Sequence, residues 1–284
     1  MVGVIQNDDF RVSARDTGAE LISFVDKRGE ENYEYIWQKD PEIWTGSSPL
    51  LFPVVGKLKD DAYTLDGVEY HLEKHGFARK KRFELESQGA QEMTFLLRED
   101  EETLKSYPFP FELRVRYCLV ENGFVMEHRV KNTGEKTMYF SLGAHPGFRC
   151  AMGDALELDE EETASAFRLD ENFLRAPDKV PALDHSRTIT ITPELFAHDA
   201  LIFDGLRSRG ATLKRANGRN VHVDFGGAPC LGVWAKPAAP YVCVEPWYGI
   251  DDNWDAGGEL SAKERICALE AGGEFVFPVT VTLA

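Results

Sequence analysis

Three polar residues in apolar surroundings, each beside glycine or proline, have the side-chain types that proton transfer requires. His75 lies in the segment HGFAR, His145 in LGAHPGF and Glu245 in YVCVEPW. A carboxylate at the end of an apolar run is partly desolvated, which raises its pKa and makes it a better base. Because Pro246 has no N–H to donate to a sheet ladder, we expect Glu245 to lie where a strand leaves its sheet. The three residues together predict an acid–base site.

Other interpretations of these residues remain open. Either histidine alone is compatible with a structural side chain at a strand end, and Glu245 alone with a surface salt bridge. His71 and His75 lie four residues apart, but no cysteine or carboxylate cluster near them completes a set of metal ligands. The sequence also lacks G-x-S-x-G, P-loop and G-x-G-x-x-G patterns. We therefore expect neither a metal nor another cofactor.

The charge and composition narrow the class of partner. The chain has 284 residues, with 48 acidic against 32 basic side chains and a net charge of −16. This excess of negative charge disfavours nucleic acid and anionic membranes and favours a neutral small molecule. No apolar stretch approaches the roughly 20 residues of a membrane span, and the N-terminus does not read as a signal peptide. Five scattered cysteines favour reduced thiols. We expect a cytoplasmic monomer or homodimer.

Alternation with a period of two dominates the sequence and predicts strands. The clearest pair is 111–119 and 124–130, joined by Glu-Asn-Gly, which accepts the positive φ of a tight hairpin. Further strands are expected at 63–70 around Asp-Gly, 93–98, 138–142, 187–191, 221–225, 241–245 and 275–283, with short helical turns at 193–198 and 261–265. Strands about every ten residues with scarce helices predict an all-β, large antiparallel β-sandwich, formed as a single domain over residues 1–284.

Four segments, taken in chain order, resemble the aldose 1-epimerase (galactose mutarotase) family, and within it the LacX-like subgroup. They are PLLFPVVGKL at 49–58, HGFAR at 75–79, GAHPGF at 143–148 and VEPW at 244–247. The resemblance spans nearly the whole chain. It implies the family's supersandwich fold, with a sugar bound in a cleft on one curved sheet, which agrees with the period-two pattern.

The resemblance also implies the catalytic roles. Glu245 corresponds to the family's base on the anomeric hydroxyl, and His145 to the acid on the ring oxygen. His75 corresponds to a histidine that binds the sugar and polarises its reacting end. Ring opening to the aldehyde, rotation about C1–C2 and closure then interconvert the α and β anomers of a hexose. This mechanism requires no metal, nucleotide or covalent intermediate.

The remaining sugar contacts are assigned from the same resemblance. Lys57 stands where the family has an arginine, and a lysine offers a point charge in place of a planar fork. Asp199 is our choice for the sugar-holding aspartate, with Asp204 as the competitor. Trp247 offers a flat apolar face for stacking on the sugar.

Arg79 leaves the substrate class open. An arginine at this place in the motif also resembles the related hexose-6-phosphate 1-epimerase subgroup, and Lys57 with the basic run 80–82 would add positive charge. The alternative is that Arg79 pairs with a carboxylate in the cleft and the run 80–82 faces solvent. We favour a free hexose, and keep a hexose 6-phosphate or non-catalytic carbohydrate binding as alternatives. A glycosidase or lyase ranks lower, because a glycosidase needs two paired carboxylates and we find one.

Overall fold

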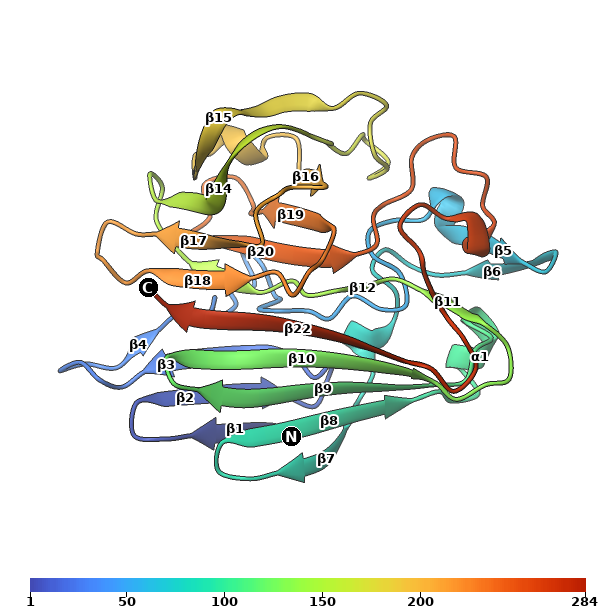
Figure 1. The fold of residues 1–284 in the computed structure, drawn as a ribbon, viewed down its shortest axis with the longest axis horizontal. Coiled ribbons are helices and arrows are strands. Elements are labelled where there is room, and N and C mark those ends of the chain that lie inside the picture. The colour runs from blue at the N-terminus through green and yellow to red at the C-terminus, as the bar shows by residue number, and fades with distance from the viewer.

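The computed structural model describes residues 1–284, and antiparallel strands are its dominant regular structure (Figure 1). Its largest element is a nine-stranded sheet in the order β15-β14-β17-β18-β22-β10-β9-β8-β7. In that order the strands are Val180–Thr190, Ala155–Ala166, Gly210–Lys214, Val221–Asp224, Glu274–Leu283, Gly123–Asn132, Phe111–Val120, Glu92–Arg98 and Glu84–Gln88. Figure 1 shows them as one continuous twisted ladder.

Two smaller sheets are present beside it. The N-terminal sheet has the order β1-β2-β3-β4, with strands Val2–Gln6, Phe10–Arg15, Leu21–Asp26 and Tyr33–Glu34. The other has five strands. Its main path is β12 (Leu142–Gly143), β20 (Tyr241–Tyr248), β19 (Cys230–Trp234) and β16 (Leu201–Asp204), and β13 (Gly147–Arg149) also pairs with β20. β20 is the central strand of this sheet.

The remaining elements are short. Two two-stranded ladders join β5 (Ala62–Leu65) to β6 (Val68–His71), and β11 (Met138–Phe140) to β21 (Cys267–Leu269). The helical elements are α1 (Thr103–Ser106) and four 3₁₀ turns at Lys59–Asp61, Ala78–Lys80, Glu194–Phe196 and Leu260–Ala262. None of these helices is long and apolar enough to cross a membrane.

The alternation in the sequence produces the core directly. In β9 every second residue from Phe111 to Leu119 is buried and the intervening ones are partly exposed, as expected for a strand with one face on the core. The Phe24 ring of β3 packs 4.9 Å from the Phe124 ring of β10, and the Tyr248 ring of β20 packs 5.1 Å from the Phe277 ring of β22. Both smaller sheets therefore contact the large one, and the predicted antiparallel sandwich is confirmed.

The expectation that a strand ends at Glu245 is wrong. β20 continues through Pro246 to Tyr248, and Glu245 pairs with Gly232 in its middle. The proline is tolerated because its missing N–H faces an interruption in the neighbouring strand. β13 pairs with residues 241–243 and β12 with residues 247–248, and residues 144–146 between them belong to neither strand.

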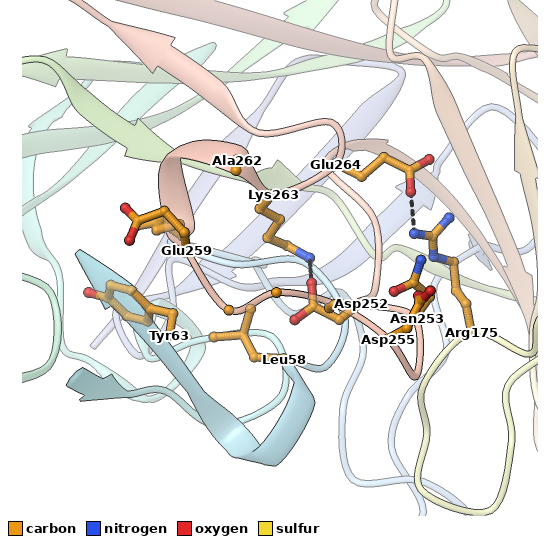
Figure 2. A pocket seen from close by; sticks show the side chains of 14 residues that line it. Leu58, Tyr63, Arg175, Asp252, Asn253, Asp255, Glu259, Ala262, Lys263 and Glu264 are labelled. Atoms are coloured by element: carbon orange, nitrogen blue, oxygen red, sulfur yellow. Dashed lines mark hydrogen bonds and ion pairs between the residues drawn. The ribbon is translucent and has the colours of Figure 1, made fainter. Parts of the chain in front are cut away.

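The loop after β20 is fixed by a group of ion pairs (Figure 2). Arg175, which is 3% exposed, pairs with Glu264, and its Nε donates to the Asp251 carbonyl at 2.7 Å. Lys263 Nζ lies 2.5 Å from Asp252 Oδ1. These pairs line a cavity of about 240 Å³ behind the loop. The position of Asp251 is therefore set by buried charges rather than by a regular element.

His128 makes the stability of the fold depend on pH. It is buried in β10 and stacks on Phe277, and this burial lowers the pKa of its imidazole to about 4. The unfolded chain binds this proton below about pH 6.5, so acidification favours unfolding. We expect the free energy of unfolding to fall by about 2–3 kcal/mol between pH 7 and pH 4.5 through His128 alone.

Urea unfolding at the two pH values measures this effect. His128→Phe keeps an aromatic ring against Phe277 and should reduce the loss on acidification by about 2–3 kcal/mol. His71→Gln, at an exposed position, is the control and should leave the loss unchanged. An identical loss in His128→Phe and the wild-type protein would contradict the assignment.

Candidate active site

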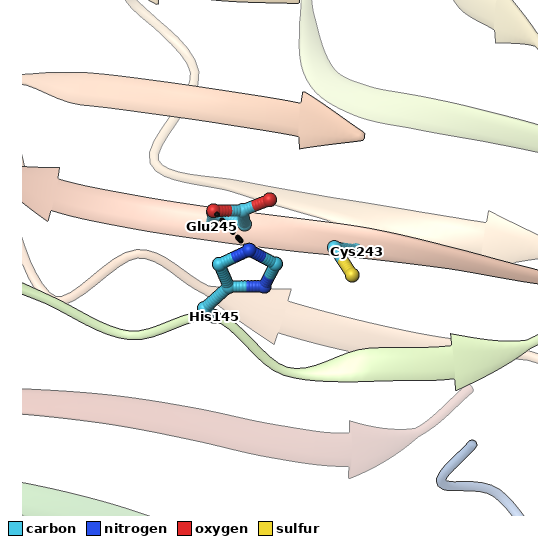
Figure 3. A group of neighbouring side chains, drawn as sticks. All are labelled: His145, Cys243 and Glu245. Carbon is cyan, nitrogen blue, oxygen red and sulfur yellow. Dashed lines mark ion pairs between the residues drawn. The ribbon is translucent and has the colours of Figure 1, made fainter. Parts of the chain in front are cut away.

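His145 and Glu245 are brought together by the interruption opposite β20. The Ala144 N–H donates to the Pro246 carbonyl at 3.1 Å, and the Val244 N–H donates to the Pro146 carbonyl at 3.2 Å. His145 is thereby held directly across from Glu245. Its Nε2 lies 3.3 Å from Glu245 Oε2 (Figure 3). Two residues one hundred positions apart in sequence thus share one contact.

Aromatic rings pack around His145 and exclude water from it. Trp44 stacks on it with ring centroids 5.4 Å apart and planes 27° apart, while Trp234 meets it edge-on at 5.7 Å. Burial in this setting lowers the pKa of His145 to about 3. Its Nδ1 is buried without a hydrogen-bond partner, so Nε2, on the Glu245 side, is the nitrogen placed to exchange a proton.

Glu245 is only 2% exposed, and burial raises the pKa of its carboxyl well above 4.5. The positive charge of Lys74 opposes this rise, whereas the negative charges of Asp199 and Asp251 add to it. Burial thus disfavours the charge on both members of the pair. A carboxyl group with a raised pKa is suited to proton transfer near neutral pH.

His75 is held in one tautomer by its backbone neighbour. The Gly56 N–H donates to His75 Nδ1 at 3.0 Å, and the His75 N–H donates to the Gly56 carbonyl at 2.8 Å. Since Nδ1 accepts, Nε2 carries the proton of the neutral ring. Burial lowers the pKa of His75 well below 6.5, so the ring stays neutral. His75 is therefore a fixed hydrogen-bond donor at Nε2, 6.0 Å from the His145 ring between centroids.

The cavity that holds these residues has a volume of about 270 Å³, large enough for a monosaccharide, whose own volume is on the order of 150–200 Å³. Six residues singled out from the sequence line it, namely His75, Arg79, His145, Asp199, Glu245 and Trp247. Lys57 does not. Its Nζ lies 3.3 Å from Asp61 Oδ2, and only its backbone N–H turns toward the site, donating to Asp251 Oδ1 at 2.8 Å.

The basic residues 80–82 of the expected patch form ion pairs outside the cavity. Lys80 pairs with Glu73, Lys81 with Asp100 and Glu102, and Arg82 with Asp16, so the run 80–82 is neutralised by exposed or peripheral carboxylates. Arg79 differs, because it lines the cavity and forms no ion pair. Its Nη2 donates to the Lys74 carbonyl at 2.7 Å, and its Nε is buried without a partner.

The two candidate aspartates, Asp199 and Asp204, lie in different places relative to the cavity. Asp199 lines the cavity in a left-handed conformation with φ of 60°, and its carbonyl accepts from Arg168 Nη1 at 3.2 Å. Asp204 lies at the end of β16 and pairs with Arg265 at 2.7 Å, outside the cavity lining. The geometry favours Asp199 over Asp204 as a group that contacts a ligand.

Several lining residues were missed by the sequence analysis. Lys74 immediately precedes His75 in the chain, and Asp251 follows Glu245 by six residues in a Gly-Ile-Asp turn. Asp251 Oδ2 is buried without a partner, and burial raises the pKa of this carboxyl. Trp44 and Trp234 also line the cavity. Lys74 and Asp251 do not lie in an alternating strand pattern. The one signal in the sequence that could have found them is their closeness to the His75 and Glu245 motifs.

Cys243 lies two residues before Glu245 on the same face of β20, close to the pair (Figure 3). Its Sγ and the ligand atoms of His145 and Glu245 lie within 4.8 Å of one another. Burial, with the nearby Glu245 charge, raises the pKa of the thiol well above 9. The group at this position is therefore a neutral thiol, which is a poor metal ligand compared with a thiolate.

Comparison with known proteins identifies the family and the fold. The sequence model of the family described as aldose 1-epimerase matches residues 1–261. The chain belongs to the aldose 1-epimerase family. It is 34% identical over 279 residues to the plasmid-encoded protein LacX of Lactococcus lactis subsp. lactis, covering 92% of each chain. The structure superposes with a TM-score of 0.94 on a galactose mutarotase related enzyme from Lactobacillus acidophilus, 36% identical, covering 100% of this chain and 97% of that one.

The chain also matches a more distant relative. The chain is 24% identical over 275 residues to a putative glucose-6-phosphate 1-epimerase of Cenchrus ciliaris, covering 81% of this chain and 72% of the relative. Membership of the aldose 1-epimerase family implies a sugar substrate and an isomerase type of activity. The all-β sandwich expected from the sequence is the galactose mutarotase-like fold.

Gly56 is the backbone position on which the His75 tautomer depends. Its φ is 68°, and a Cβ there would lie 2.1 Å from Asp251 Cγ. Gly56→Ala should destabilise the protein by about 3 kcal/mol, from left-handed strain plus the clash, and raise KM for the sugar because the His75 contact moves.

Gly67→Ala is the matched control for this substitution. Gly67 has φ of 77° with nothing within 4 Å of its Cβ position, at the β5–β6 turn. Gly67→Ala should lower the free energy of unfolding by only about 1 kcal/mol and leave KM unchanged. Thermal unfolding and steady-state kinetics of both variants make the comparison, and equal effects of the two substitutions would contradict the role given to Gly56.

Proposed function

We propose that this protein is an aldose 1-epimerase that interconverts the α and β anomers of a free hexose, with Glu245 and His145 as the catalytic acid–base pair. The observation that carries the proposal is the 3.3 Å approach of His145 Nε2 to Glu245 Oε2 at the wall of a cavity of about 270 Å³. The anomeric hydroxyl and the ring oxygen of a pyranose are bonded to the same carbon. A base and an acid that serve both must therefore be neighbours, as these two are.

The reaction needs one mobile proton on the pair. Glu245 takes the proton of the C1 hydroxyl while His145 gives one to the ring oxygen, the C1–O5 bond breaks, and the open-chain aldehyde forms. After rotation about C1–C2, the C5 hydroxyl attacks the other face of the carbonyl and the two proton transfers reverse. Atoms and charge balance, and the site returns to its starting state. Burial favours the neutral pair with its shared proton on Glu245, so in our proposal the reactive form is the one in which this proton has moved to His145 Nε2 and left Glu245 ionised.

The other lining groups hold the sugar in our proposal. His75 donates from Nε2, while Asp199 and the unpartnered Oδ2 of Asp251 accept from hydroxyls. Trp247 and Trp234 offer apolar faces to the C–H side of the ring. A set of one fixed donor and two acceptors at a buried cavity recognises a polyhydroxylated ligand and leaves few unsatisfied groups once it is bound.

Removal of either proton-transfer group should abolish most of the activity. Glu245→Gln and His145→Gln are each expected to lower kcat by about 10²–10⁴-fold, since a positioned acid or base contributes that much. Both variants should remain folded, because glutamine keeps hydrogen-bonding capacity at each position without a buried charge. Exchange NMR or polarimetry on fresh α-D-galactose and α-D-glucose measures the rate.

Glu92→Gln is the control for these variants, because Glu92 pairs with Arg116 on the exposed face of the large sheet. It should retain the wild-type rate. The proposal fails if the wild-type protein accelerates the exchange of neither sugar. It also fails if Glu245→Gln is as active as Glu92→Gln. Sugar-dependent thermal stabilisation that persists in Glu245→Gln without any turnover would instead support a binding protein.

A hexose 6-phosphate is the second candidate substrate, favoured by one observation. Lys74 and Arg79 both line the cavity, and neither forms an ion pair with a protein carboxylate. Lys74 Nζ instead lies 4.6 Å from the centroid of the Phe173 ring. For a free hexose, Lys74→Met should change kcat/KM by less than about tenfold, whereas for a 6-phosphate it should lower kcat/KM by about tenfold or more.

Rates on D-glucose and D-glucose 6-phosphate, compared in the wild-type protein and Lys74→Met, decide between the substrates. The free-hexose proposal expects a higher kcat/KM on the unphosphorylated sugar. The reverse preference, removed by Lys74→Met, would assign the phosphorylated substrate.

A further inference from the structure

A second cationic site lies away from the catalytic cavity, around Arg215. This residue follows β17 and is only 6% exposed, yet it forms no ion pair. Its Nη1 donates to the Tyr33 hydroxyl at 3.1 Å, and its guanidinium lies 4.8 Å from the centroid of the Tyr35 ring. Nε and Nη2 are buried with no hydrogen-bond partner. The stacking on tyrosine holds the face of the guanidinium and leaves the two donors of one edge unsatisfied.

Arg215 lines a cavity of about 360 Å³ together with a second arginine, Arg149. Arg149 is exposed, is the last residue of β13 and also forms no ion pair; its one side-chain hydrogen bond is donated by Nη1 to the Glu34 carbonyl at 3.4 Å. The only carboxylate in the lining is Asp154, and its two oxygens already accept from the Ala151 and Ala216 N–H groups at 2.8 and 3.0 Å. Two guanidinium charges thus face a cavity whose single carboxylate is bonded to the backbone.

Several other arginines of this chain, which has a net charge of −16, pair with carboxylates. Arg114 on the large sheet, for comparison, contacts both Glu86 and Glu112. Arg219, which lies over the same Tyr33 ring at 5.2 Å but outside the cavity lining, pairs with Asp26 at 3.6 Å. Carboxylates are available throughout the surface, so the lack of one opposite Arg149 and Arg215 favours an anion supplied from outside.

We propose that this cavity binds a phosphate group, either free or as the ester of a small metabolite, between Arg215 and Arg149. Nε and Nη2 lie on the same edge of a guanidinium and present two parallel donors, which match two oxygens of one phosphate. Two arginines also match the charge of a phosphate near neutral pH better than that of a monocarboxylate. The shielded edge of Arg215 turns toward the cavity on binding, while the tyrosine ring continues to support its face.

The site is distinct from the catalytic cavity, because the two share no lining residue. A series of packed aromatic rings nevertheless connects them. Trp37 lines the phosphate cavity and lies 4.9 Å from Tyr241, and Tyr241 lies 5.1 Å from Trp44, which stacks on His145. Phosphate binding next to Trp37 should therefore change the tryptophan fluorescence of the full chain.

Isothermal titration calorimetry and tryptophan fluorescence on the full-length protein test the proposal with orthophosphate, glucose 6-phosphate and acetate. We expect saturable binding of phosphate, at least about tenfold weaker in Arg149→Gln and in Arg215→Lys, which keeps the charge and removes the fork. Arg149 is exposed, so its variant reports even if substitution of Arg215 impairs folding. Arg219→Gln is the matched control and should stay within about threefold of wild type, and Arg79→Gln should leave orthophosphate binding unchanged.

The relative affinities for orthophosphate, glucose 6-phosphate and acetate decide between the outcomes. Orthophosphate bound as tightly as the ester, and weakened by Arg149→Gln, supports a site for free phosphate. An ester that binds about tenfold more tightly and is likewise weakened by Arg149→Gln supports a phosphorylated metabolite. The proposal is overturned if acetate binds as well as phosphate, or if no phosphate binds at about 10 mM. It is also overturned if Arg79→Gln removes the binding while Arg149→Gln retains it.

Discussion

The candidate site depends on one feature of strand pairing, the interruption of the ladder opposite the middle of β20. Because β12 and β13 pair in the same register with the two ends of that strand, His145 in the segment between them is placed across from Glu245 at 3.3 Å. Two backbone hydrogen bonds, from Ala144 and from Val244, fix this position on either side. The approach of His145 to Glu245 is therefore set by backbone geometry, as the proposed proton transfer requires.

Burial of His145 and Glu245 changes the pKa values of both side chains. Tryptophan rings exclude water from His145, and the same desolvation lowers the pKa of the imidazole to about 3 and raises that of the Glu245 carboxyl well above 4.5. Neither group is stable as an isolated ion, so the pair favours its neutral state, with the shared proton on Glu245. The charges at the cavity wall, Lys74 on one side and Asp199 and Asp251 on the other, act on the same carboxyl in opposite directions.

The sequence predicted the sandwich and the central residues because both follow from short-range patterns. Alternation located β9 and β10, and Gly and Pro beside His145 and Glu245 marked an irregular segment. The end of a strand at Glu245 was predicted wrongly, since the effect of Pro246 depends on a partner strand distant in sequence. Lys57 and Lys74 show the same limit, because side-chain direction in a loop is set by tertiary contacts such as the Lys57–Asp61 pair and carries no period.

The most direct measurement of the central claim is a crystal structure of the Glu245→Gln protein soaked with α-D-galactose. The account predicts the sugar inside the cavity, with its C1 hydroxyl within about 3.2 Å of the side chain at position 245 and its ring oxygen within the same distance of His145 Nε2. A sugar bound with C1 directed away from both side chains, or bound only outside this cavity, would contradict it.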